Sequence, residues 1–155
     1  MSALRQQLGD FSSIFCFKAA ITGMGDALRE KATAIALTSG DRARGKKLAG
    51  ELGLVGSSMS LDDVASKLNM ALGKDGTRLC IVERIVAEGE NIKVYTSETV
   101  CSAGEPPNSP RQCTLTMDAV WGAIEQLIGK RFKGVHTECL LRGGTHDVFE
   151  FIPFE

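Results

Sequence analysis

Apolar residues follow a helical period through the first part of the chain. Ile14, Phe17, Ile21, Met24 and Leu28 recur at steps of three and four residues, which places them on one face of a helix. Small residues lie on the same stretch: Ala19, Ala20, Gly23 and Gly25. They indicate a seam where another helix packs closely or, alternatively, the wall of a ligand site in which small side chains leave room.

Two further helices are expected before the pattern changes. Residues 38–41 predict a break, after which Asp41 or Ser39 would cap a second helix. Residues 60–63 have the form of a capping box, a serine followed three residues later by an acid. They predict a third helix, which Gly73 would close.

From residue 77 the period becomes extended. Apolar and β-branched residues over 79–86 predict a strand, and those over 92–99 predict its return. The Gly-Glu-Asn turn at residues 89–91 would join them as a hairpin. Three prolines within residues 104–110 predict a surface loop.

The C-terminal part predicts a helix and a second hairpin. Thr116 is expected to cap a helix that contains Trp121 and stops at Gly129. Strands are expected over 132–141 and 147–154, joined by a turn at Gly143-Gly144. The absence of βαβ alternation favours an α+β fold. We therefore expect one domain over residues 1–155, with N-terminal helices packed on an antiparallel sheet and a helix between two C-terminal hairpins.

Composition narrows the class of protein. The 155 residues carry 18 basic and 19 acidic side chains, a net charge of -1, which argues against generic nucleic-acid binding. No apolar run reaches the roughly 18 residues of a membrane span, and the N-terminus has no signal pattern. Five cysteines without a CxxC pair favour a reducing compartment. We expect a cytoplasmic protein that does not span a membrane.

Four cations lie close together near the start of the second expected helix, and three of them are candidate ligand contacts: Arg42, Arg44 and Lys47. One interpretation is a solvated helix face. The other is a clamp for the carboxylate or phosphate of an acidic ligand, because guanidinium groups pair well with such anions.

Potential metal ligands gather near the C-terminus: His136, Glu138, Cys139, His146 and Asp147. Strand alternation would put His136 and Glu138 on one face and Cys139 on the other, which divides the group. We therefore predict no metal site, while hairpin-stabilising roles, a structural zinc and ligand contact remain alternatives. Cys139 is expected to point inward, either as a buried thiol or as a thiol at a pocket.

A composite pattern in the C-terminal half resembles a known family. Its parts are Cys113-Thr-Leu-Thr, the helix from Met117 to Gly129-Lys130, Val135-His-Thr-Glu-Cys139, the Gly143-Gly144 turn and Phe149-Glu-Phe151. Together they resemble the 4-vinyl-reductase-type domain, which is related to haem-NO-binding domains and to a vesicle-tethering-particle subunit. The resemblance covers residues 77–155, and the helical N-terminal part only in layout. The last cysteine of the family pattern falls near Asp147, so no two-cysteine metal or redox site is predicted there.

The resemblance implies a homodimer whose apolar pocket binds a hydrophobic small molecule, such as a bilin or chlorophyll-precursor tetrapyrrole. It also implies a role with photosystem or pigment-protein assembly proteins, so the protein would be cytoplasmic or peripheral at a photosynthetic membrane. The expected ligand-binding residues are Arg42, Arg44, Lys47, Trp121 and Cys139. No general acid/base constellation is present, which argues against catalysis. A porphyrin vinyl-group reductase component and a ligand-free assembly scaffold are the alternatives.

Overall fold

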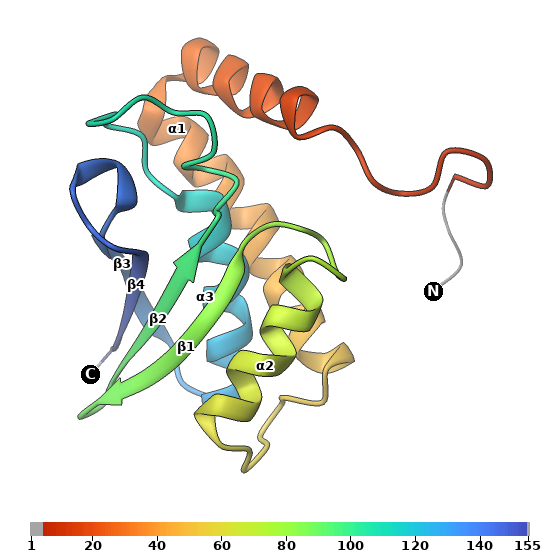
Figure 1. Ribbon diagram of the computed structural model, residues 1–155. Coiled ribbons are helices and arrows are strands. Elements are labelled where there is room, and N and C mark those ends of the chain that lie inside the picture. Colours follow the sequence, from red (N-terminus) through yellow and green to blue (C-terminus); the bar gives the residue numbers. More distant parts are fainter. Residues whose placement is uncertain (1–4, 155) are drawn as a thin grey trace.

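The computed structural model describes residues 5–154 (Figure 1). Its elements in chain order are α1 (Ile14–Glu51), α2 (Leu61–Leu72), β1 (Ile81–Glu88), β2 (Asn91–Ser97), α3 (Thr114–Ile128), β3 (Phe132–Glu138), the short 3-10 helix η1 (Leu140–Arg142) and β4 (Asp147–Pro153). The predicted α+β class is confirmed, as are both hairpins.

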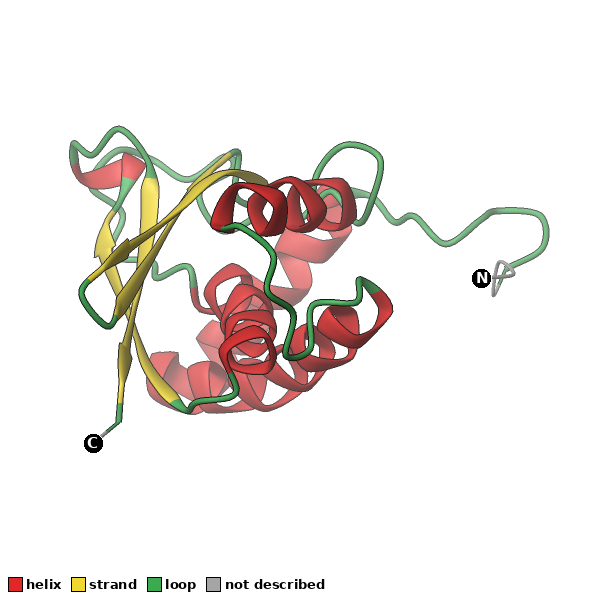
Figure 2. Cartoon of the chain, turned by 90° about the horizontal axis from the view of Figure 1, so that it is seen from below, coloured by secondary structure: helices red, strands yellow, loops and turns green. Residues whose placement is uncertain are grey.

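The sheet has the strand order β1-β2-β4-β3, and every neighbouring pair is antiparallel. Figure 2 shows the three α-helices gathered on one side of it. Along β2, buried and half-buried residues alternate, and Ile92, Val94 and Thr96 are buried. This period-two pattern gives the sheet one face for the core. Phe149 and Phe151 of β4 complete that core and are fully buried.

The expected break at residues 38–41 is wrong, because α1 continues through it to Glu51. The helix is interrupted earlier, at Arg29, whose φ of 63° and ψ of 157° are not helical. The Thr33 hydroxyl donates to the Met24 carbonyl oxygen at 2.9 Å, and so bridges this kink. Serine, glycine and aspartate have weak helix propensities, but packing against α3 keeps this segment helical.

Glycines set the close approach of α1 to α3. A Cβ atom at Gly45 would collide with the Ala119 carbonyl oxygen, and one at Gly122 would collide with the Arg42 carbonyl oxygen. Both positions therefore need glycine for the two backbones to meet. The second part of α1 is held against α3 by this contact, while the part before the kink projects away from the sheet (Figure 1).

Local chemistry sets two helix boundaries, and two other boundaries differ from the prediction. The Ser60 side chain accepts from the Asp63 N–H, so the predicted cap of α2 is confirmed. Helix α3 begins at Thr114 with Cys113 at its N-cap, so the prediction that Thr116 caps it is wrong. Gly129 ends α3 in the left-handed conformation that favours glycine, with a φ of 73°. Strand β3 stops at Glu138, earlier than predicted, because the chain turns into η1.

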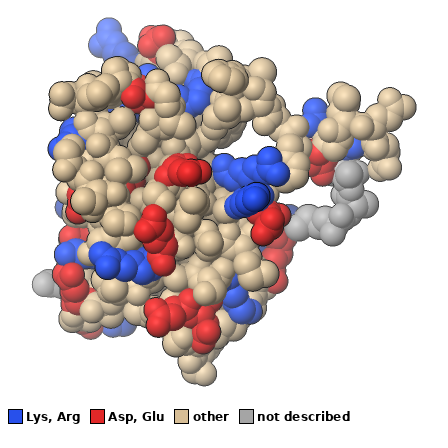
Figure 3. Space-filling model, in the orientation of Figure 1, with Lys and Arg blue, Asp and Glu red and all other residues tan. Residues whose placement is uncertain are grey.

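Surface charge is mixed in sign. In the view of Figure 3, acidic and basic side chains alternate over the surface without a large area of one sign. Among the described residues, no helix combines the length and the apolar character that crossing a membrane requires.

Candidate functional site

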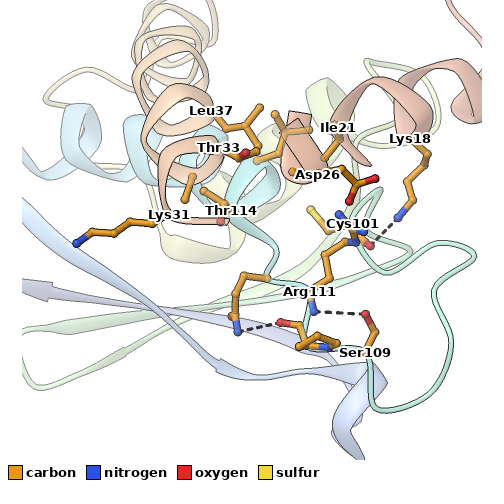
Figure 4. A pocket seen from close by; sticks show the side chains of 15 residues that line it. Lys18, Ile21, Asp26, Lys31, Thr33, Leu37, Cys101, Ser109, Arg111 and Thr114 are labelled. Atoms are coloured by element: carbon orange, nitrogen blue, oxygen red, sulfur yellow. Dashed lines mark hydrogen bonds between the residues drawn. The ribbon is translucent and has the colours of Figure 1, made fainter. Parts of the chain in front are cut away.

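A pocket of about 480 Å³ lies in the bend of α1 (Figure 4). Residues from both parts of the kinked helix line it, together with the loop between β2 and α3 and the first turn of α3. Its apolar lining comes from Ile21, Ala34, Leu37, Pro110 and Leu115. Small-molecule sites commonly have volumes of about 300–1,000 Å³ and mainly apolar walls. The kink at Arg29 therefore creates a cavity of suitable size and lining.

Ionic groups at one end of the pocket share a single carboxylate. Lys18 on α1 donates to Glu105 Oε1 at 2.6 Å and to the Cys101 carbonyl oxygen at 3.0 Å. Arg111 Nε lies 3.0 Å from the same Glu105 oxygen, in an ion pair without the alignment of a hydrogen bond. The Lys18 hydrogen bond, opposed by burial, holds the pKa of Glu105 below its usual value. Glu105 therefore ties the loop to the first part of α1.

Cys101 brings a thiol to the pocket wall. Figure 4 shows its sulfur pointing into the cavity, and the Thr116 hydroxyl lies 3.4 Å from it. A hydrogen bond from the Cys113 thiol, reinforced by Thr116 and opposed by burial, lowers the pKa of Cys101 to about 7. Of these two neighbouring thiols, Cys101 is therefore the more acidic.

A fully buried carboxylate, Asp147, stands at the centre of a polar cluster beneath the pocket loop. Thr99 and Ser102 donate their hydroxyls to its Oδ2 at 2.8 and 2.6 Å. His136 Nε2 and the Leu140 N–H lie 3.2 and 3.3 Å from its Oδ1. Burial favours the neutral acid, but these donors outweigh it and hold the pKa of Asp147 far below its ordinary value. The carboxylate joins β3, β4 and the start of the loop that lines the pocket.

The predicted division of the C-terminal cluster is wrong, because β3 has a bulge. The pairing of β3 with β4 shifts register between His136 and Glu138. As a result His136 and Cys139 both hydrogen-bond Asp147, while the carboxylate of Glu138 accepts from the Thr145 N–H at 2.7 Å. A bulge re-aims side chains, so simple alternation fails here.

Three side chains of this cluster are suited to hold a metal ion: Cys113, His136 and Asp147. Their ligand atoms lie within 4.8 Å of one another. Sulfur, imidazole nitrogen and carboxylate oxygen are the donors that zinc takes in proteins. The Nδ1 atom of His136 is buried without a hydrogen-bond partner among the described residues, so the imidazole has one nitrogen still to satisfy. The donor set therefore fits such an ion.

Arg42, predicted as a ligand contact, instead contacts two residues of α3. Its guanidinium pairs with the buried Glu125 on α3 and stacks on the Trp121 ring, 4.2 Å from the centroid. Burial opposes ionisation of Glu125, but hydrogen bonds from Arg42 and from the Phe132 N–H outweigh it and lower the pKa of that carboxyl. Arg42 thus ties α1 to α3, away from the pocket in the bend.

The other predicted ligand residues do not line that pocket either. Arg44 and Lys47 are exposed, and Lys47 pairs with Glu51 one turn along α1. Trp121 of α3 is half-buried and packs against β3, where a Cβ at Gly134 would lie 2.8 Å from its ring. Cys139 is buried, as predicted, beside Asp147. Contact of these residues with a ligand stays a prediction.

The fold has a solved counterpart. It is similar to the crystal structure of the phenol-responsive sensory domain of the transcription activator PoxR, determined with phenol, with a TM-score of 0.70 and 12% sequence identity. The similarity covers 93% of this chain and 76% of that one. No protein-family model and no curated protein sequence matches the chain. At this identity the likeness shows a common fold.

Sequence reasoning missed the residues that form the pocket. Thr33, Ala34 and Leu37 meet Ser109 and Arg111 only because α1 bends at Arg29. No proline marks that bend, so the sequence carries no strong signal for it. The small residues predict either a helix-packing seam or a ligand wall, and one of them, Gly25, lines the pocket.

Proposed function

We propose that this protein binds a small, mainly apolar molecule in the pocket at the bend of α1, and that it acts by binding rather than by turnover. The observation that carries the proposal is the pocket itself: apolar walls from two helix segments, together with a limited set of polar and charged side chains. Such a lining gives affinity through apolar burial and orientation through a few polar contacts. The similar PoxR domain was solved with phenol, which supports this class of function.

The pocket is built so that a ligand would touch two separately held parts of the molecule. One wall belongs to the first part of α1, which contacts the loop through the Lys18–Glu105 ion pair. The opposite wall belongs to the second part of α1, which packs on α3 across Gly45. A ligand between them would favour one angle at Arg29 over others, as a ligand stabilises the state it binds best. Ligand binding would thereby affect any partner that the N-terminal part of α1 contacts.

Filling the pocket tests the proposal. Ala34→Phe places a phenyl ring in the cavity, and we expect it to abolish binding of phenol while leaving the melting temperature within a few degrees of the wild type. Ala36→Phe, an exposed position two residues along α1, is the matched control and should bind as the wild type does. Titration calorimetry with phenol measures both. Equal phenol binding by the two variants would contradict a site in this pocket.

We also propose that the protein forms a homodimer through its N-terminal apolar face, made of Phe11, Ile14, Phe15, Phe17 and Leu28. All five side chains are exposed, and Phe15 is 83% exposed. Figure 1 shows this segment projecting from the rest of the molecule, where a second copy could pack on it. Exposed apolar area of this kind is characteristic of interaction surfaces.

Light scattering after size exclusion measures the assembly. We expect a dimer for the wild type and a monomer for Phe15→Ser. Phe154→Ser changes an exposed phenylalanine at the other end of the chain and should leave the dimer intact. A wild-type monomer at all concentrations would contradict the homodimer.

The sequence resemblance supports a narrower proposal, in which the ligand is a tetrapyrrole and the protein serves pigment-protein assembly. Incubation with biliverdin or protoporphyrin IX tests it directly. A shifted and intensified visible spectrum that Ala34→Phe abolishes would support this ligand class. An unchanged spectrum would restrict the function to smaller molecules.

A further inference from the structure

The charged end of the pocket contains more positive than negative charge. Three of its ionic side chains are largely shielded from solvent: Lys18 is 18% exposed, Arg111 31% and Glu105 12%. The two other charged lining residues, Asp26 and Lys31, are exposed and opposite in sign. Exposed charges are screened by water and salt, so the shielded set decides the local potential. That set carries one net positive charge.

The Arg111 side chain is the group with unused hydrogen-bonding capacity. Lys18 is satisfied by Glu105 and by the Cys101 carbonyl, whereas Arg111 has only the imperfectly aligned ion pair through Nε. Within residues 5–154, no hydrogen bond is formed by its two terminal nitrogens. One of them, Nη1, reaches across the pocket to within 3.9 Å of where a Cβ of Gly25 would lie. The guanidinium therefore presents donors to the cavity at the edge of the apolar wall.

We propose that the ligand of this pocket is a small apolar monocarboxylate, whose carboxylate binds Arg111 and neutralises the shielded positive charge. This inference rests on the proposed function and names the ligand class for the same site. Guanidinium groups bind carboxylates with two parallel hydrogen bonds, which suits the free terminal nitrogens. The apolar body of the ligand would lie along Ile21, Leu37 and Leu115.

Glu105 competes with such a ligand for Arg111. The ion pair between the two residues must weaken when a second carboxylate arrives. Glu105→Gln keeps the size of the side chain and removes its charge, so it should raise the affinity for an anion. Arg111→Gln should lower it. The backbone at Arg111 is held separately, since its N–H donates to Ser109 Oγ and its carbonyl accepts from Arg142, so Arg111→Gln should not unfold the loop. Glu105→Gln keeps a side-chain oxygen that can accept from Lys18 or from the Ser109 hydroxyl, so the loop should stay attached to α1.

Benzoate and its neutral isostere benzamide are the probes, titrated by calorimetry at pH 6, where benzoate is ionised. We expect Arg111→Gln to weaken benzoate binding roughly 10- to 100-fold, as loss of a charge-assisted hydrogen bond does. Glu105→Gln should strengthen it several-fold, and Arg111→Lys should restore part of the loss. Benzamide affinity should respond little to any of the three variants. Asp75→Asn, which removes an exposed carboxylate outside the pocket, is the matched control and should change benzoate affinity less than about twofold.

The outcomes separate the two proposals. Benzamide binding as tightly as benzoate, or a benzoate affinity that Arg111→Gln leaves unchanged, would overturn the carboxylate class while leaving a ligand pocket. Failure of benzoate, benzamide and phenol alike to bind the wild type, whose fold is verified by its melting transition, would overturn both. A gain at Glu105→Gln together with a loss at Arg111→Gln supports the inference.

Discussion

Replacing Asp147 with alanine should lower the free energy of unfolding by about 3–5 kcal/mol, the cost of removing one partner of a buried ionic network. Asp147 is fully buried and receives hydrogen bonds from Thr99, Ser102, His136 and the Leu140 N–H. Alanine would leave these donors buried without an acceptor. Since they come from the loop, β3 and η1, the loop that lines the pocket should also lose order. Urea unfolding followed by circular dichroism measures the change.

Two comparisons make the Asp147 prediction specific. Asp147→Asn keeps the shape and one acceptor oxygen, so it should lose less stability than alanine does. Asp75→Ala removes an exposed carboxylate and should change stability by less than about 0.5 kcal/mol. A loss below about 1 kcal/mol for Asp147→Ala would show that the cluster does not hold the loop.

Replacing Asp118 with asparagine should stabilise the protein at alkaline pH. Asp118 lies on α3 facing α1, is fully buried, and neither carboxylate oxygen has a well-formed hydrogen bond among the described residues. Burial raises the pKa of Asp118 to about 6, with Asp41 adding to the effect and Thr38 and Arg42 opposing it. The folded protein therefore holds this proton more tightly than the unfolded chain does.

The sign of the pH dependence follows from that raised pKa. Below about pH 4, where the carboxyl is protonated in both states, Asp118 costs nothing by ionisation. Between about pH 4 and pH 6 the unfolded chain releases this proton while the folded protein keeps it, so the penalty grows over this range and is complete above about pH 6. A shift of this size corresponds to about 2–3 kcal/mol. We expect Asp118→Asn to be more stable than the wild type by that amount at pH 8 and nearly equal to it at pH 4.

Thermal or urea unfolding at both pH values measures the Asp118 effect. Asp75→Asn removes an exposed aspartate and should show no comparable change between the two conditions. Asp41, whose pKa burial also raises to about 6, should titrate lower in the Asp118→Asn variant because a neighbouring negative charge is gone. Equal stabilities at pH 8 would contradict an ionisation penalty at Asp118.

The elements that local chemistry determines could be predicted from the sequence. The Ser60 cap, the turn between β1 and β2 and the alternation of Ile92, Val94 and Thr96 depend on neighbours within a few residues, and all three agree with the structure. The α+β order follows from the same local patterns. Cys139 was correctly expected to be buried.

Features that depend on tertiary contacts could not be predicted. Helix α1 continues through Ser39, Gly40 and Asp41 because the segment packs against α3, and it bends at Arg29, where propensity gives no reason to bend. The bulge after His136 changed which side chains meet Asp147. Cys113 belongs to that cluster although it is 23 positions before His136 in the sequence. The pocket could not be predicted for the same reason, because its residues meet only through the bend at Arg29.

Mapping the bound ligand onto the backbone shows whether the bend of α1 is the ligand site. We would titrate ¹⁵N-labelled protein with benzoate and with phenol and follow the amide shifts by heteronuclear NMR. We expect the largest shifts on the two walls of the bend, at Ile21, Gly25, Ala34, Leu37 and Leu115, and we expect Ala34→Phe to abolish them. Shifts concentrated in the turn at residues 142–145, or no shifts at all with either compound, would contradict a ligand site in the bend of α1.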